Sequence, residues 1–234
     1  MTSTTSFRKT EIYVALLWII TAAGAIGGAS LINPIINAPD YLTLVFPKSV
    51  TITSGMFGWM INDIGIVFIG LLMYPILKKH SESMALGYLS MRMFESLLMI
   101  VGVFFALMLI PLSRDFINAG TADVSTLQTI GSILKQAENW FLNLLQLIFL
   151  GIGGLILNLI FYKTKLVPRV ISIFGFIGYA LLLPAAVVGL FGLLDPTPGG
   201  PGSILAVPVA LWEIIIMPVW LFTKGFNTDY LSAK

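Results

Sequence analysis

The sequence has little charge, no cysteine and a single histidine. Charged residues make up 10% of its 234 residues, whereas a soluble domain usually has about 25%. So few charged side chains cannot cover a soluble globule, which excludes a soluble enzyme. The net charge of +2, with no basic stripe, excludes a nucleic-acid partner. The scarcity of cysteine and histidine excludes disulfides, thiolate metal sites and multi-histidine metal or haem sites, so no metal or cofactor is expected.

Apolar residues, by contrast, make up 57% of the chain and gather in six long stretches. Each stretch has the roughly 20 residues that a helix needs to cross a bilayer core of about 30 Å. The first stretch is longer than the apolar region of a signal peptide, so we expect it to remain as a span. We therefore predict an all-α integral membrane bundle, one domain over residues 1–234. The predicted spans are Ile12–Ile32, Gly55–Leu77, Ala85–Ile110, Trp140–Tyr162, Val170–Leu194 and Ser203–Phe222.

The basic residues lie mostly on one side of this predicted bundle. Of the 13 lysines and arginines, Arg92 lies within a span, and Lys48, Arg114 and Lys135 fall in the loops of one side. The other side has the remaining nine, which are Arg8, Lys9, Lys78, Lys79, Lys163, Lys165, Arg169, Lys224 and Lys234. Because basic residues are enriched in cytoplasmic loops, we predict that both termini face the cytoplasm of a prokaryotic cell, with the chain in its inner membrane.

Two of the loops on the opposite, outer side are expected to be more than linkers. The segment Asn37–Ser54 mixes apolar residues with prolines and is expected to rest on the membrane interface. The segment Asp123–Glu138 has apolar residues at helical spacing, which predicts a short amphipathic helix before span four. An ordinary helical loop is an equal alternative for this second segment. The turn over residues 195–202 is rich in proline and glycine.

Four ionisable residues fall inside the predicted spans: Asp63, Arg92, Glu95 and Glu213. The helical rise places them about 10–15 Å from the nearer membrane face. Arg92 and Glu95 are three residues apart and therefore share a helix face. Intramembrane charges are expensive and usually face a partner or a cavity, so these residues are candidate ligand-binding groups.

A charge count sharpens this expectation, because three carboxyl groups accompany one guanidinium. If the groups lie close together, one carboxyl is expected to be protonated or a cation is expected to bind. The alternative is purely structural, with Arg92 pairing with Glu95 or Glu213 to fix helix packing.

Other polar and aromatic residues extend the candidate site. Asn139, Asn143 and Gln146 form a polar stripe at i, i+4 and i+7 in span four, and Trp212 is too deep for an interfacial anchor and is expected to line the cavity. Span five offers only Ser172 and is expected to face lipid. The glycine pair Gly24 and Gly28, with similar pairs in spans four and five, favours close helix packing inside the chain over a dimer interface.

Several short motifs resemble an uncharacterised prokaryotic membrane family, domain of unknown function 4386. They are Arg92-Met-Phe-Glu95, the run from Tyr162 to Arg169, Gly175 with Gly178-Tyr179, Trp212-Glu213, and the run from Trp220 to Gly225. The chain departs from the family at Glu138, near which the family often has a histidine. The resemblance implies a multi-span helical protein, flags Arg92, Glu95 and Glu213, and implies no activity.

Three functions compete at this stage. The leading hypothesis is a protein that binds or transports a small molecule in a central, outward-opening polar cavity, with proton or cation dependence. The second is an accessory or sensory subunit acting through a partner subunit or a second copy of itself. The third is an enzyme that modifies a membrane lipid, although the sequence has no histidine box, no Asp-rich metal motif and no Gly-x-Ser-x-Gly motif.

Overall fold

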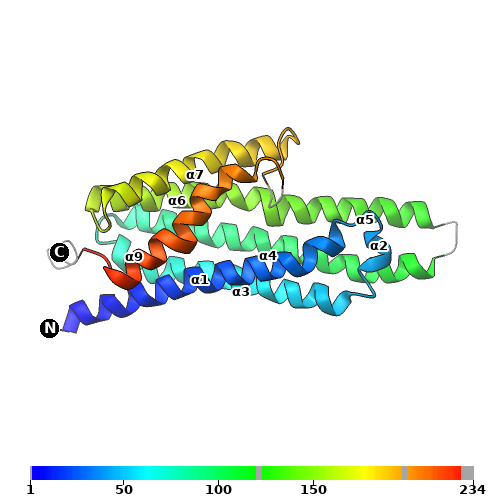
Figure 1. Ribbon diagram of the computed structural model, residues 1–234, viewed down its shortest axis with the longest axis horizontal. Helices are drawn as coiled ribbons and strands as arrows, with labels where there is room; N and C mark the ends of the chain where they lie inside the picture. Colours follow the sequence, from blue (N-terminus) through cyan, green and yellow to red (C-terminus); the bar gives the residue numbers. More distant parts are fainter. Residues whose placement is uncertain (1, 120–122, 197–199, 228–234) are drawn as a thin grey trace.

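The computed structural model describes residues 2–119, 123–196 and 200–227, and every regular element within these ranges is a helix (Figure 1). The long helices are α1 (Thr2–Ile36), α3 (Ser49–Leu77), α4 (Glu82–Asn118), α5 (Val124–Glu138), α6 (Gln146–Thr164) and α7 (Arg169–Leu190). The short helices are α2 (Tyr41–Leu44), α8 (Val207–Leu211) and α9 (Met217–Thr223). Two π-helical segments join consecutive helices: Asn139–Leu145 lies between α5 and α6, and Trp212–Ile216 lies between α8 and α9. A 3-10 turn, Ser203–Ala206, directly precedes α8.

Six helical stretches are long and apolar enough to cross a membrane, which confirms the prediction of an all-α chain with six candidate spans. They are Phe7–Ile36, Ser49–Leu77, Glu82–Asn118, Val124–Thr164, Arg169–Leu190 and Ser203–Thr223. The last of these, hereafter the last span, contains α8 and α9.

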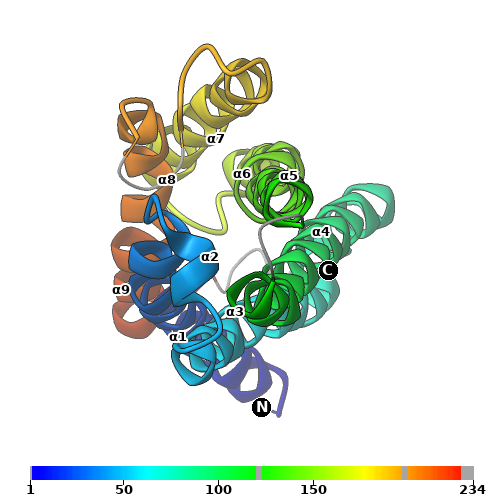
Figure 2. The ribbon, with the colours of Figure 1, turned by 90° about the vertical axis from the view of Figure 1, so that its right-hand side faces the viewer.

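The six spans form a ring in chain order. α1 packs on α3, α3 on α4, α4 on α6, and α6 on α7, and the last span closes the ring by contacting α7 through α8 and α1 through α9 (Figure 2). The last span therefore runs diagonally from α7 to α1. In such a ring, one face of each span is directed toward the interior.

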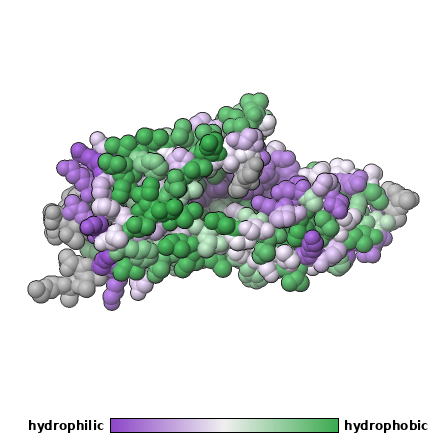
Figure 3. Space-filling model, in the orientation of Figure 1, coloured by the Kyte–Doolittle hydropathy of each residue, from purple (hydrophilic) through white to green (hydrophobic). Residues whose placement is uncertain are grey.

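Two helical stretches are longer than a membrane is thick. α4 has 37 residues and the continuous stretch from α5 through α6 has 41, which correspond to about 55 and 60 Å. The predicted outer loop 111–139 is therefore mostly the projecting ends of these two helices. The predicted amphipathic helix at 123–138 is confirmed as α5, which continues into α6 without a turn. In Figure 3, the surface is more polar over this projecting end and apolar over the opposite half.

The projecting end also holds α2, which lies in the predicted interfacial segment 37–54. The Ser113 hydroxyl of α4 donates to the Leu42 carbonyl at 2.6 Å and accepts from the Phe46 backbone amide at 2.8 Å. Ser113 is fully buried, so α2 is fixed against α4. This segment is thus part of the folded bundle.

Glycines allow α1 and α3 to lie in close contact. A Cβ added at Gly28 would lie 2.6 Å from the Gly55 carbonyl oxygen, and one at Gly24 would lie 2.6 Å from that of Gly58. No larger residue fits at such a distance, so the predicted internal packing of Gly24 and Gly28 is confirmed.

Both described chain ends lie at one end of the bundle, called here the terminal end; the opposite end is called the far end (Figure 1). Arg8 on α1 donates to the carbonyls of Leu221 at 2.6 Å and Phe222 at 2.5 Å. Glu11 accepts from Arg8 at 3.0 Å and from the Phe226 backbone amide at 2.9 Å. These contacts, called here the terminal clasp, join the beginning of the chain to its last described residues. Lys234 and part of the turn at 195–202 lie outside the described residues.

Candidate functional site

Arg92 is the centre of a buried charged network. Its side chain is 3% exposed, and its Nη1 donates to both carboxylate oxygens of Glu95 at 3.0 and 2.8 Å. Its Nη2 donates to Oε1 of Glu213 at 2.7 Å, and its Nε donates to the Tyr88 hydroxyl at 3.3 Å. Charge-assisted hydrogen bonds of this kind are about twice as strong as neutral ones. The network therefore ties α4 to the last span.

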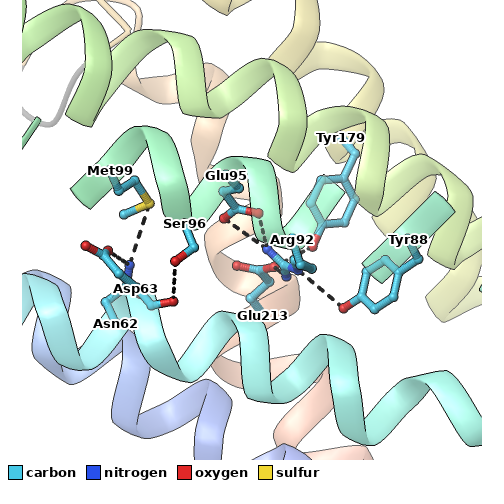
Figure 4. A network of polar contacts seen from close by, with 9 residues as sticks. All are labelled: Asn62, Asp63, Tyr88, Arg92, Glu95, Ser96, Met99, Tyr179 and Glu213. Carbon is cyan, nitrogen blue, oxygen red and sulfur yellow. Dashed lines mark hydrogen bonds and ion pairs between the residues drawn. The ribbon is translucent and has the colours of Figure 1, made fainter. Parts of the chain in front are cut away.

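Tyr179 of α7 also belongs to this network, which the sequence reasoning missed. Its hydroxyl donates to Oε1 of Glu213 at 2.7 Å, and its side chain is fully buried (Figure 4). Span five of the sequence analysis is α7. The prediction that this span faces lipid is therefore wrong for the face of α7 that carries Tyr179. The motif Gly178-Tyr179 was a usable signal, because a tyrosine deep in an apolar span needs a partner for its hydroxyl.

Asp63 lies apart from the Arg92 network. Figure 4 shows it in a second group with Asn62, Ser96 and Met99. Asn62 donates to its Oδ1 at 3.3 Å, while its Oδ2 is buried and has no hydrogen bond with the residues described. The sequence placed Asp63 at a similar depth, but α3 packs with Gly70 beside Arg92 and with Asp63, two turns away on the same face, beside Ser96.

A central cavity of about 280 Å³ lies inside the ring, and all six spans contribute to its wall. Arg92, Glu95, Glu213 and Gln146 form its charged and amide part. Glu213 is the most accessible of the three charged groups, with 21% of its side chain exposed against 5% for Glu95. The chemical group that a molecule in this cavity meets is therefore the Glu213 carboxylate.

The polar stripe of span four is divided between two cavities. Gln146 lines the central cavity, whereas Asn139 and Asn143 line a larger one of about 690 Å³ at the far end. Glu138 and Lys135 of α5 also line this far-end cavity. A hollow with polar surface is visible between the apolar half and α5 in Figure 3. The single outward-opening cavity expected from the sequence is thus two spaces at different depths.

Trp212 lies in the core and does not line the central cavity. It is fully buried, its ring stacks edge-on against Trp18 and Tyr179, and its Nε1 donates to the Ile171 carbonyl at 3.0 Å. A Cβ added at Gly175 would lie 2.5 Å from that Nε1, so only glycine leaves room for the indole there. Trp212 positions the last span rather than contacting a ligand.

Two stretches of the chain that carry candidate site residues are π-helical. The segment Asn139–Leu145 contains Asn139 and Asn143, and the segment Trp212–Ile216 contains Glu213. π-helical segments are rare and occur frequently at functional sites, because the extra residue per turn redirects side chains. One segment therefore coincides with Glu213 of the central cavity, and the other with Asn139 and Asn143 of the far-end cavity.

Within the described part of the chain, no group of three or more His, Asp or Glu side chains is placed to hold a metal ion. The chemistry available is that of one guanidinium, two carboxyl groups, two phenols and the two amides of Gln146 and Asn62. These groups can bind a ligand and exchange a proton.

Comparisons with known proteins identify a family but no activity. A family model described as a domain of unknown function (DUF4386) matches residues 14–225, which begins in α1, earlier than the sequence motifs indicated. No curated protein and no solved structure matches the chain. The match covers most of the chain, and the chain therefore belongs to the DUF4386 family of multi-span membrane proteins.

Proposed function

We propose that this protein binds or transports a small ligand in its central cavity, with a dependence on protons or cations that arises from the Arg92, Glu95 and Glu213 network. The observation that carries the proposal is the Arg92, Glu95 and Glu213 network at the cavity wall, deep inside the bundle. Buried ionisable groups in a membrane are costly to retain, so they usually serve a function.

The charge balance of the network supports a cation or proton as the exchanging species. One guanidinium faces two carboxyl groups, which leaves one negative charge when both are ionised. The other polar groups facing Glu213 are the hydroxyls of Tyr88 and Tyr179, which are neutral, and Asp63 on α3 adds no positive charge. One proton or one bound monovalent cation would neutralise this remaining negative charge.

Arg92 itself is a poor receptor for an anionic ligand. Its guanidinium donates to Glu95, Glu213 and Tyr88, and 3% of its side chain is exposed. An anion would have to displace a carboxylate from it. Arg92 therefore holds Glu213 in place, and Glu213 meets the ligand.

Infrared difference spectroscopy in lipid tests the proposal. We expect a protonated-carboxyl band that changes with pH in the wild type and is lost or shifted in Glu213→Gln. Glu82→Gln is the matched control, because Glu82 is exposed and hydrogen-bonds Tyr74. The proposal fails if every carboxyl titrates like a free one in water, or if Glu213→Gln leaves the band unchanged.

We further propose that the protein lies in a prokaryotic inner membrane with both termini in the cytoplasm. In support, the helix order gathers eight of the described basic residues at the terminal end, from Arg8 and Lys9 to Lys224. Single cysteines added at Lys79 and Arg114 of this cysteine-free chain test the orientation. A membrane-impermeant maleimide should label only the Arg114→Cys variant in intact cells, and labelling of the Lys79→Cys variant alone would reverse the orientation.

A further inference from the structure

The central cavity has an apolar wall around its charged end. Aliphatic side chains from five spans line it, among them Ile26, Ile66, Leu147, Leu182 and Val209. The indole rings of Trp18 and Trp59 line it as well. A hydrated inorganic ion would find few oxygen ligands in such a space. The wall suits a molecule with an apolar body.

Trp18 supplies an independent sign that the cavity receives a ligand. It is 2% exposed, it lines the cavity, and its Nε1 has no hydrogen bond with any residue described. Buried N–H groups in proteins are nearly always paired, so this donor is left for an acceptor that the described residues do not supply. Trp212 shows the contrast, since its Nε1 is paired with a backbone carbonyl.

The cavity opens sideways between α1 and the last span. Ala22, Ala25 and Ile26 line one edge of this opening, and Ala206 and Ile214 line the other. Ile26 and Ile214 are 59% and 37% exposed, so residues of the cavity wall also reach the protein surface. The surface beside the opening is apolar, and Figure 1 shows α8 diverging from α1 where α9 crosses it. The opening therefore faces lipid chains.

We propose that the ligand is a lipophilic cation that enters from the bilayer between α1 and α8. This inference rests on the proposed function and names its ligand class. The apolar body packs on the aliphatic wall, the cationic group lies beside the Glu213 carboxylate, and an acceptor on the ligand receives the Trp18 N–H. The indole faces of Trp18 and Trp59 favour a cation further. An anion of the same shape would meet two carboxyl groups instead.

Benzoylcholine is a suitable probe, because it combines a phenyl ring, an ester carbonyl and a quaternary ammonium. Its neutral isostere, 3,3-dimethylbutyl benzoate, has the same shape without the charge, and choline lacks the apolar body. We expect the purified protein in nanodiscs to bind benzoylcholine at least about tenfold more tightly than either comparison compound. Equal affinity for the neutral isostere, or for choline, overturns the inference.

Variants assign the binding to the named groups. Glu213→Gln should weaken benzoylcholine binding by about tenfold or more, and Trp18→Phe by severalfold, while Glu82→Gln should bind like the wild type. A failure to bind benzoylcholine while the infrared carboxyl band still changes with pH rejects the lipophilic cation and leaves the proposed function standing. Loss of that titration rejects both.

The sideways route has its own test. Cysteines placed at Ala25 and Ala210, on opposite edges of the opening, can be joined by a bifunctional methanethiosulfonate, since the natural chain has no cysteine. We expect the crosslinked protein to bind benzoylcholine more slowly than the same double-cysteine variant before crosslinking, and reduction to restore the rate. An unchanged rate in the crosslinked protein would place access at the far-end cavity.

Discussion

Arg92 holds two carboxyl groups that would otherwise face each other unpaired. Removing one partner of a buried ion pair costs about 3–5 kcal/mol, because the remaining charge stays buried without compensation. We expect Arg92→Gln to lower the free energy of unfolding by about this amount in a reversible detergent titration.

The same reasoning predicts a rescue. Adding Glu95→Gln to Arg92→Gln removes an unpaired carboxylate, so the double variant should be more stable than Arg92→Gln alone. If the double variant is equally unstable or worse, Arg92 stabilises the protein through packing and not through its charge.

Tyr179 tests the network from α7. Tyr179→Phe keeps the ring that packs on Trp212 and removes the hydroxyl that donates to Glu213. Hydrogen bonds to charged groups contribute about 1.5–3 kcal/mol, so we expect a loss of stability in that range, measured by the same titration. Tyr162→Phe, at an exposed tyrosine, is the control and should change stability by less than about 0.5 kcal/mol. Equal effects in both variants would remove Tyr179 from the network.

At the scale of residues, the sequence identifies charges well and neutral partners poorly. Arg92, Glu95 and Glu213 stand out because an apolar span makes every charge conspicuous. Tyr179 does not, since tyrosine is common in membrane helices. Asp63 shows the second limit: helical rise gives only an approximate depth, and the packing of α3 on α4 places Asp63 beside Ser96 instead of Arg92.

At the scale of elements, the contact between α1 and α3 depends on glycine. We expect Gly28→Ala to lower the free energy of unfolding by about 1–3 kcal/mol, because its Cβ would lie 2.6 Å from the Gly55 carbonyl oxygen. Gly27→Ala, at the preceding residue, is the matched control, because a Cβ added there would meet nothing within 4 Å. It should be neutral or stabilising by up to about 1 kcal/mol, as alanine is the better helix former. Similar losses in both variants would show that helix packing is not the cause.

The terminal clasp makes a second prediction for an element. Glu11→Ala removes the acceptor for the Phe226 amide and the partner of Arg8. We expect amide hydrogen exchange over residues 221–226 to rise by about tenfold, which corresponds to about 1.4 kcal/mol. Lys9→Ala, at an exposed neighbour, should leave the exchange unchanged. Unchanged exchange in Glu11→Ala would mean that α9 is held by its apolar contacts alone.

Element types could be predicted from the sequence, and element ends could not. The six apolar stretches and the helix at 123–138 have the expected positions, because length and periodicity are local properties. α4 and α5 extend beyond the apolar stretches because they pack on each other outside the apolar half, which is a tertiary effect. The π-helical segments have no local signal in the sequence.

At the scale of the whole molecule, the ring explains why charges from distant parts of the sequence meet. Arg92 and Glu213 are 121 residues apart, and they come together because the last span closes the ring between α7 and α1 and its Glu213 reaches inward to α4. The same crossing leaves the opening between α1 and α8. Composition predicts membrane spans, but it contains no information on how the last helix closes the ring.

The most direct test of this account is an experimental density map of the protein in lipid nanodiscs, at a resolution that shows ordered water. With benzoylcholine present, the account predicts ligand density in the central cavity, with the ammonium beside the Glu213 carboxylate and the ester oxygen within hydrogen-bond distance of Trp18 Nε1. A dry, closed interior around a fully paired Arg92, or a cavity that holds water alone, would contradict it.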